Sequence, residues 1–159
     1  MTAVLSRRKA IRLGALADYA GYHLRLAQDA SFQAFVSRVG SSDIRPGYFT
    51  LLTLVRENPG ITQTAISQAS GRDKSTLTPA MRYLEDNGYI ERLRVANDRR
   101  AYGLHLTPAG EKAIAQLSAH ASAHDEELDR IIGAERKAEF IGILRDIVAA
   151  LSNPQNVRE

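Results

Sequence analysis

The feature that most constrains the fold is a succession of two short helical segments between positions 62 and 87. The first runs over 62–70: Thr62 is a residue type that caps helix N-termini, and Gly71 can adopt the left-handed conformation that ends a helix. The second runs over about 74–87, and its apolar residues are spaced to share one face: Leu77, Met81 and Leu84. Two short helices joined by a tight glycine turn predict a helix-turn-helix.

Two strand-like segments follow directly. Residues 89–95 and 102–106 are rich in β-branched, aromatic and alternating side chains, and the polar residues 96–100 between them are typical of a turn. We therefore expect a two-stranded hairpin beside the helix-turn-helix.

Helical periodicity extends on both sides of this segment. Residues 11–39 predict one long helix or two abutting ones, and Pro46 suits the first turn of a helix that stops at residues 58–60. Thr107 and Pro108 form a cap and first-turn pair that opens a long helix ending near Gly133. A final apolar stripe over 140–151 predicts one more helix before a polar tail.

The expected fold is mainly α-helical with a small β-hairpin wing. We expect one domain over 1–159, with a winged helix-turn-helix lobe over 46–106 and a helical dimerisation region over 8–40 and 107–152. The terminal helices carry apolar stripes that so small a lobe cannot cover alone, which predicts a homodimer.

Composition excludes several kinds of site. The 159 residues include no cysteine, which removes disulfides, thiolate metal sites, cysteine nucleophiles and thiol-based sensing together. No uncharged apolar run reaches the roughly 20 residues needed to cross a bilayer, and we expect a cytoplasmic protein. No phosphate-binding glycine loop or nucleophile elbow is present, so neither an enzyme nor a bound cofactor is expected.

The central motifs resemble those of the MarR (multiple antibiotic resistance regulator) family. Between 61 and 113 the chain carries Leu-Glu-x-x-Gly-Tyr-Ile-x-Arg, then Asp-Arg-Arg, then Leu-Thr-Pro-x-Gly. The resemblance implies a double-stranded-DNA-binding transcription regulator, usually a ligand-controlled repressor, that recognises a palindromic operator as a homodimer. Two-fold symmetry predicts half-sites about 10 base pairs apart.

The second short helix is the expected recognition helix. Its outer face carries Ser75, Pro79 and Arg82, with Thr76 and Thr78 flanking them. Threonine can offer a methyl to thymine, and arginine can pair with guanine through two hydrogen bonds. A solvated face carrying the same residues is the alternative. Because Pro79 removes a backbone donor, we expect a local bend or a later helix start.

The hairpin is expected to project positive charge. Arg92, Arg94, Arg99 and Arg100 have only Glu91 and Asp98 as nearby counter-charges along the chain, which suits a minor groove. The resemblance makes Arg100 the best candidate to enter or flank that groove, with Asp98 orienting the wing. Arg99 is the less certain neighbour, because adjacent hairpin residues usually point in different directions, and Arg94 is a further candidate DNA contact on account of its charge. A solvated charged turn is the alternative.

Aromatic residues in the first two helices are candidate effector ligands. By the resemblance, a small aromatic or phenolic effector would contact Tyr19, Tyr22, His23, Tyr48 and Phe49. Packing in a core or an interface is the commoner role of such residues.

Two histidines lie one helical turn apart further along the chain. His120 and His124, with Asp125 adjacent, have the spacing of metal ligands, but surface or interface positions are more usual and no metal site is expected. A winged-helix module that binds protein rather than DNA is the remaining alternative function.

Overall fold

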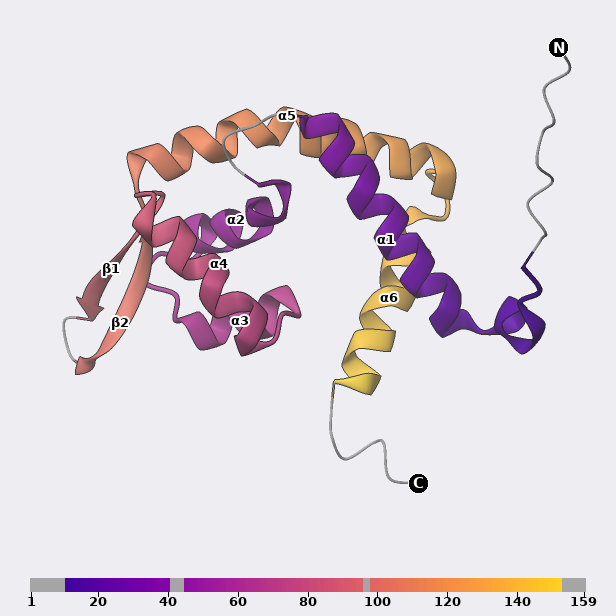
Figure 1. Ribbon diagram of the computed structural model, residues 1–159, viewed down its shortest axis with the longest axis horizontal. Helices are drawn as coiled ribbons and strands as arrows, with labels where there is room; N and C mark the ends of the chain where they lie inside the picture. The colour runs from indigo at the N-terminus through magenta and orange to yellow at the C-terminus, as the bar shows by residue number, and fades with distance from the viewer. Residues whose placement is uncertain (1–10, 41–44, 96–97, 153–159) are drawn as a thin grey trace, which may run out of the picture. The chain divides into compact units, whose positions relative to one another are not determined.

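The chain divides after Ala34 into two compact units, each described by itself. The computed structural model describes the backbone of residues 11–40, 45–95 and 98–152, and their side chains except those of 95 and 98–101 (Figure 1). In the first unit a 3₁₀ turn, Gly14–Asp18, precedes helix α1, Ala20–Val39, whose residues from Phe35 onward belong to the second unit. The predicted helical region is thus one α-helix led by a tighter turn.

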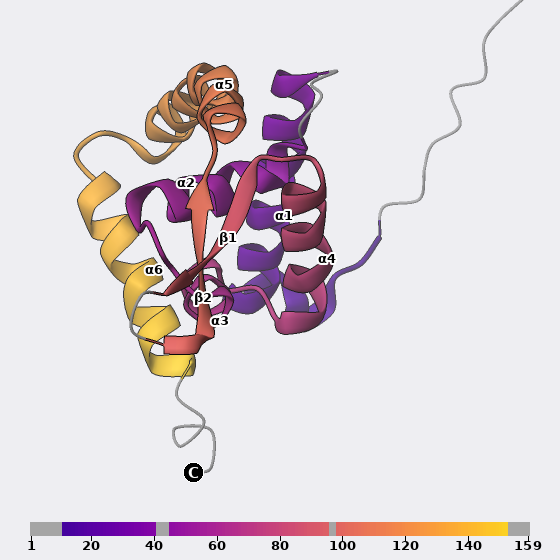
Figure 2. The same cartoon turned by 90° about the vertical axis from the view of Figure 1, so that its left-hand side faces the viewer.

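The second unit contains the winged helix-turn-helix, which confirms the predicted fold class. After a 3₁₀ turn that begins at Pro46, the elements are α2 (Phe49–Glu57), α3 (Gln63–Ser70), α4 (Lys74–Asp86), β1 (Ile90–Val95), β2 (Asp98–Leu106), α5 (Pro108–Ile132) and α6 (Lys137–Leu151). Figure 2 shows the antiparallel hairpin with α4 alongside it.

Three predicted cap residues have the expected conformations. Thr62 accepts a hydrogen bond from the Ala65 amide at 3.2 Å, and Gly71 ends α3 with φ 64°, in the left-handed region. Thr107 accepts from the Gly110 amide at 3.1 Å and so caps α5. The two threonines fix helix starts because each satisfies a backbone amide that the helix itself leaves unpaired, and Gly71 ends α3 because its left-handed conformation cannot continue the helix.

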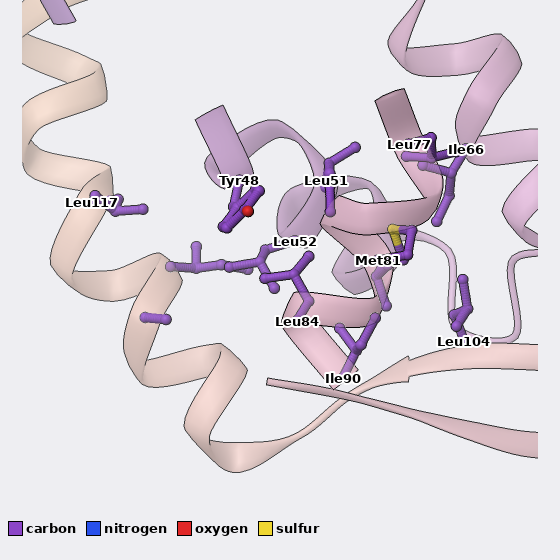
Figure 3. Close-up of a cluster of buried hydrophobic side chains, with 14 of the residues drawn as sticks. Tyr48, Leu51, Leu52, Ile66, Leu77, Met81, Leu84, Ile90, Leu104 and Leu117 are labelled. Carbon is purple, nitrogen blue, oxygen red and sulfur yellow. The ribbon is translucent and has the colours of Figure 1, made fainter. Parts of the chain in front are cut away.

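The core lies where α2, α3, α4, α5 and the hairpin meet (Figure 3). The three apolar residues predicted to share one face of α4 are fully buried there. They pack with Leu51 and Leu52 of α2, Ile66 of α3 and Leu117 of α5. Burying each such side chain contributes about 1.5–3 kcal/mol, so one face of α4 is fixed inward and the other is left outward.

The hairpin docks against the turn that leads into α3. The Gly60 amide donates to the Leu104 carbonyl at 2.9 Å, and the Leu104 amide donates to the Ile61 carbonyl at 2.9 Å. Gly103 leaves no room for a side chain, since a Cβ there would lie 2.7 Å from the Gly60 Cα. Strand β2 also begins at Asp98, so the predicted turn over 96–100 was too long.

The start of α5 is fastened to the base of the hairpin. The Thr107 hydroxyl donates to the Gly88 carbonyl at 2.6 Å, and a Cβ on Gly110 would overlap the Tyr89 carbonyl oxygen and the Leu106 side chain. The Leu-Thr-Pro-x-Gly motif therefore caps α5 and lets its first turn approach the strands closely.

We predict that Gly110→Ala lowers the free energy of unfolding by about 1–3 kcal/mol, because the new methyl must displace backbone that it overlaps. Gly21→Ala is the matched control: it lies in α1, where nothing is within 4 Å of the added Cβ, and alanine is the better helix former. Urea denaturation of the two variants measures the difference. Equal stabilities of Gly110→Ala and the wild type would contradict the close approach.

Candidate nucleic-acid interface

The outer face of α4 is exposed and polar. Ser75, Thr76, Thr78, Pro79 and Arg82 are all solvent-exposed, opposite the buried apolar face. The structure therefore brings the predicted recognition-helix residues together on one accessible surface. Such a surface has the form needed to enter a major groove, because its centre carries short side chains and its far end a long cationic one.

The helix begins before Pro79 and continues past it. Asp73 caps α4 by accepting from the Thr76 amide at 2.7 Å and from the Ser75 hydroxyl at 2.7 Å, and the helix runs from Lys74 to Asp86. The expectation of a later helix start was therefore wrong, because the cap fixes the first turn. Proline has no amide proton to donate to the carbonyl of Ser75, four residues earlier.

Two hydroxyl protons on this face are used within the protein. Ser75 donates to Asp73, and the Thr78 Oγ1 donates to the Lys74 carbonyl at 2.8 Å. A hydroxyl has one proton, so in this arrangement both oxygens can take part in further hydrogen bonds only as acceptors, and the Thr78 Oγ1 already accepts one from the Gln63 amide at 3.2 Å. Thr78 also has a methyl that is suited to contact with thymine.

Arg82 is free to reach a partner. Its side chain is 81% exposed, and its Nε lies 3.6 Å from the Asp86 Oδ2 one turn later. An exposed ion pair of this kind contributes little, so the guanidinium can exchange it for a base or a phosphate at small cost.

The structure describes the side chain of Arg94 but not the side chains at the start of β2. Arg94 is exposed on β1, and its guanidinium lies 6.0 Å from the centre of the Tyr102 ring. Asp98, Arg99 and Arg100 begin strand β2, but their side chains lie outside the described part of the chain, and their roles stay predictions.

One wing arginine is paired with a residue that sequence reasoning missed. The Arg92 Nε donates to the Glu85 Oε2 at 2.8 Å, across from β1 to α4. The expectation that only Glu91 and Asp98 balance the wing arginines was therefore wrong. Sequence separation hides this pair, because a strand and a helix come together only through tertiary packing.

A polar hollow lies beside the recognition helix. It has a volume of about 270 Å³ and lies between the start of α3 and the start of α4; it is lined by Gln63, Thr64, Lys74 and Thr78. Only Thr78 among these was predicted from the sequence. The exposed ammonium group of Lys74 gives this hollow a positive charge beside the exposed face of α4.

An aromatic hollow of about 490 Å³ lies between α1, α2 and α5 in the second unit. Phe35 and Phe49 form part of its wall, with ring centres 6.3 Å apart, and the His124 ring is 5.6 Å from that of Phe35. The remaining lining residues come from α5: Ser118, Ala121, Ser122 and Asp125. Small residues at these α5 positions leave the space that the aromatic rings border.

The predicted effector residues are not all gathered there. Phe49 lines the hollow, whereas Tyr48 is buried in the core with its ring 5.1 Å from that of Tyr83. Tyr19, Tyr22 and His23 belong to the first unit, where His23 donates to the Ala17 carbonyl at 2.7 Å and stacks edge-on with Tyr22. Among the α5 lining residues, sequence spacing singled out His124 and Asp125, but only as candidate metal ligands. It carried no signal for Ser118, Ala121 and Ser122, because alanine and serine on a helix are typical of any exposed face.

Neither a metal cluster nor a membrane segment is found in the described residues. No three or more histidine, aspartate or glutamate side chains there are arranged to hold a metal ion, and His120 lies outside the hollow to which His124 contributes. None of the described helices combines the length and apolar character needed to span a bilayer.

The chain is similar in sequence to known transcription regulators. The MarR family model matches residues 44–102. A protein of Thauera aromatica, named as a transcriptional regulatory protein for the hcr operon, is 32% identical over 148 residues, which are 92% of this chain and 89% of that protein.

Two solved structures of the transcriptional repressor CouR are similar over almost their whole length. CouR bound to a 23-mer DNA duplex has a TM-score of 0.77 and 28% identity, covering 88% of this chain and 99% of that one. CouR bound to p-coumaroyl-CoA has a TM-score of 0.76 and 27% identity, covering 87% and 98% respectively.

The cap of the recognition helix predicts a pH dependence of stability. The Thr76 amide, and then the Ser75 hydroxyl, hold the pKa of Asp73 below its usual 3.8 by donating to the carboxylate. A carboxyl group whose pKa is lower in the folded state stabilises above the unfolded pKa and loses that contribution as the pH falls through the folded value. We expect the unfolding free energy of the wild type to fall more steeply below about pH 4 than that of Asp73→Asn, which retains a capping side chain. Urea titrations between pH 5 and pH 3 measure the two slopes, and parallel curves would contradict the cap.

Proposed function

The chain belongs to the MarR family of DNA-binding transcription regulators, and from this premise we propose that it is a homodimeric repressor that binds a palindromic operator and releases it when a small aromatic ligand binds. The observation that carries this proposal is the exposed face of α4 beside a hairpin fixed to the same lobe.

The DNA-binding part of the proposal rests on how these two elements are presented. The α4 face supplies the acceptor hydroxyl of Ser75, the methyl of Thr78 and the exposed guanidinium of Arg82, which are groups that distinguish base edges in a major groove. The hairpin carries Arg94, and by the family resemblance Asp98, Arg99 and Arg100, toward the adjoining minor groove. The likeness to CouR bound to a DNA duplex supports this docking.

The homodimer rests on apolar surface that the described chain leaves uncovered. Large apolar residues along the end of α5 and along α6 are between 40% and 70% exposed: Ile131, Phe140, Ile143, Val148 and Leu151. Monomeric proteins seldom expose so continuous a stripe, and a second copy of the chain would cover it symmetrically. Two recognition helices related by two-fold symmetry then require a palindromic site.

The ligand part rests on the aromatic hollow. Its two phenylalanines suit a flat ring, while Ser122, His124 and Asp125 provide polar groups at its edge. The similar CouR structure contains p-coumaroyl-CoA, which supports an aromatic acyl compound as the ligand class. A ligand would act by binding the DNA-incompetent dimer more tightly than the competent one.

The first experiment tests sequence-specific binding. Sequences are selected from random duplex DNA by the purified protein, and the winner is titrated at two salt concentrations with the bound stoichiometry measured. We expect a palindrome with half-sites about 10 base pairs apart, bound by two chains. Weak binding without any enriched sequence would favour a winged helix that serves protein partners.

The two classes of DNA contact predict different variant behaviour. Arg82→Ala should relax specificity at one base position of each half-site, with a cost of about 1–3 kcal/mol against the preferred base. Arg100→Ala should weaken binding to every duplex and reduce the salt slope by about 1, because one phosphate or minor-groove contact is lost. An unchanged affinity and slope for Arg100→Ala would contradict the wing assignment.

Ligand control predicts release of the selected operator. Addition of p-coumaroyl-CoA should lower operator affinity in the wild type, while coenzyme A alone should not. Ser122→Phe should abolish the response without weakening DNA binding, because its ring occupies the hollow and lies away from α4. Retention of the full response in that variant would place the ligand elsewhere.

A further inference from the structure

A chain of hydrogen bonds joins the recognition helix to the wing through α3. The Arg92 Nε on β1 donates to the Glu85 Oε2 on α4 at 2.8 Å, and an Nη of the same guanidinium donates to the Gln63 Oε1 on α3 at 3.3 Å. The Gln63 Nε2 in turn donates to the Thr78 Oγ1 on α4 at 3.2 Å. One arginine and one glutamine thus link three elements.

The direction of each hydrogen bond in this chain is fixed by chemistry. Thr78 gives its only hydroxyl proton to the Lys74 carbonyl, so it must accept from Gln63. The amide nitrogen of Gln63 therefore faces Thr78, and its oxygen faces Arg92, which can only donate. Exchanging the amide oxygen and nitrogen would leave two donors opposed, so the side chain has one satisfactory orientation.

We infer that Gln63 and Arg92 form a positioning bridge that holds wing strand β1 at a set angle to recognition helix α4, and that Arg92 does not itself bind a phosphate. This inference rests on the proposed DNA-binding function. The Arg92 side chain is 36% exposed and is engaged at two of its nitrogens, in contrast to Arg82 at 81%. The other end of the bridge holds Thr78, which lies on the face proposed to meet bases.

For removal of Glu85, the bridge predicts a change in DNA affinity opposite to the change that simple electrostatics predicts. DNA is anionic, so removing an acidic side chain beside it ordinarily strengthens binding. Removal of Glu85 releases Arg92 and lets the wing change its angle to α4, so that major-groove and minor-groove contacts are no longer made together. A positioning role therefore predicts weaker binding where charge alone predicts tighter binding.

The decisive comparison is Glu85→Ala against Glu91→Ala, titrated with the selected operator. Each change removes one negative charge; Glu91 is the exposed neighbour of Arg92 on β1 and takes no part in the bridge. We expect Glu85→Ala to lower affinity about three- to tenfold, the net effect of losing one ordinary hydrogen bond. Glu91→Ala should bind as tightly as the wild type or tighter. Equal or tighter binding by Glu85→Ala would overturn the inference.

A neutral variant separates positioning from charge and from unfolding. Gln63→Ala breaks the link between Thr78 and Arg92 without changing the net charge, and we expect weaker binding together with a cooperative melting transition. Protection of the deoxyriboses at the wing from hydroxyl radicals should fade, while protection of the major-groove bases under α4 from methylation persists. Wild-type footprints on this variant would overturn the inference.

The salt slope of Arg92→Ala tests the phosphate alternative. If Arg92 only positions the wing, the slope of Arg92→Ala equals that of the neutral Gln63→Ala, which breaks the same bridge. A phosphate contact by Arg92 lowers the magnitude of the slope by about 0.9 further, and that outcome would overturn the inference. Titration of the wild type tests the proposed function separately from the bridge. If the wild type binds no selected duplex, the proposed function fails and the bridge with it; if it binds and the variants match it, the bridge alone fails.

Discussion

The close docking of the hairpin base onto the backbone of its neighbours is the constraint on which the lobe depends. Strand β2 meets the turn before α3 through backbone hydrogen bonds at Gly60 and Leu104, and the absence of a side chain at Gly103 lets the two segments touch. The absence of one at Gly110 does the same for α5 on the other side. A two-stranded hairpin is marginal in water by itself, so this docking is what keeps the wing in one place.

The recognition surface consists of the α4 residues that this packing leaves outside the core. The apolar side of α4 is committed to the core, and Asp73 fixes where its first turn begins, so the outward residues have no freedom to rotate inward. Several outward groups are also bound to their own backbone or neighbours, as Ser75 is to Asp73 and Thr78 to Lys74. The surface presented to a partner is therefore organised before the partner arrives, which lowers the entropic cost of binding.

Local sequence signals predicted the helices and strands. The parts of the candidate site that depend on tertiary contacts could not be predicted from the sequence. Thr62, Gly71 and Thr107 act within one turn of themselves, and apolar spacing acts within one helix, so sequence order alone located the helices, the buried face of α4 and its exposed face. The pairing of Arg92 with Glu85 depends on how a strand crosses a helix, which no spacing along the chain encodes. The aromatic hollow was found only in part for the same reason: Phe49 was predicted, but the small α5 residues that create the space have no distinctive pattern.

Helix α5 connects the base of the hairpin, the aromatic hollow and α6. Its first turn is held to the hairpin base by Thr107, its middle lines the aromatic hollow, and Asp125 and Asp129 near its end hold the ammonium group of Lys137 on α6 at 3.1 and 2.7 Å. Hydrogen bonds that Lys137 donates to Asp129, and then to Asp125, raise the pKa of the Lys137 ammonium group. A continuous helix shifts as a unit over such distances, because its own backbone hydrogen bonds resist bending in the middle. If a ligand fills the hollow as proposed, a displacement that starts there would reach both the base of the wing and the apolar face of α6 through this one helix, without any contact between ligand and DNA.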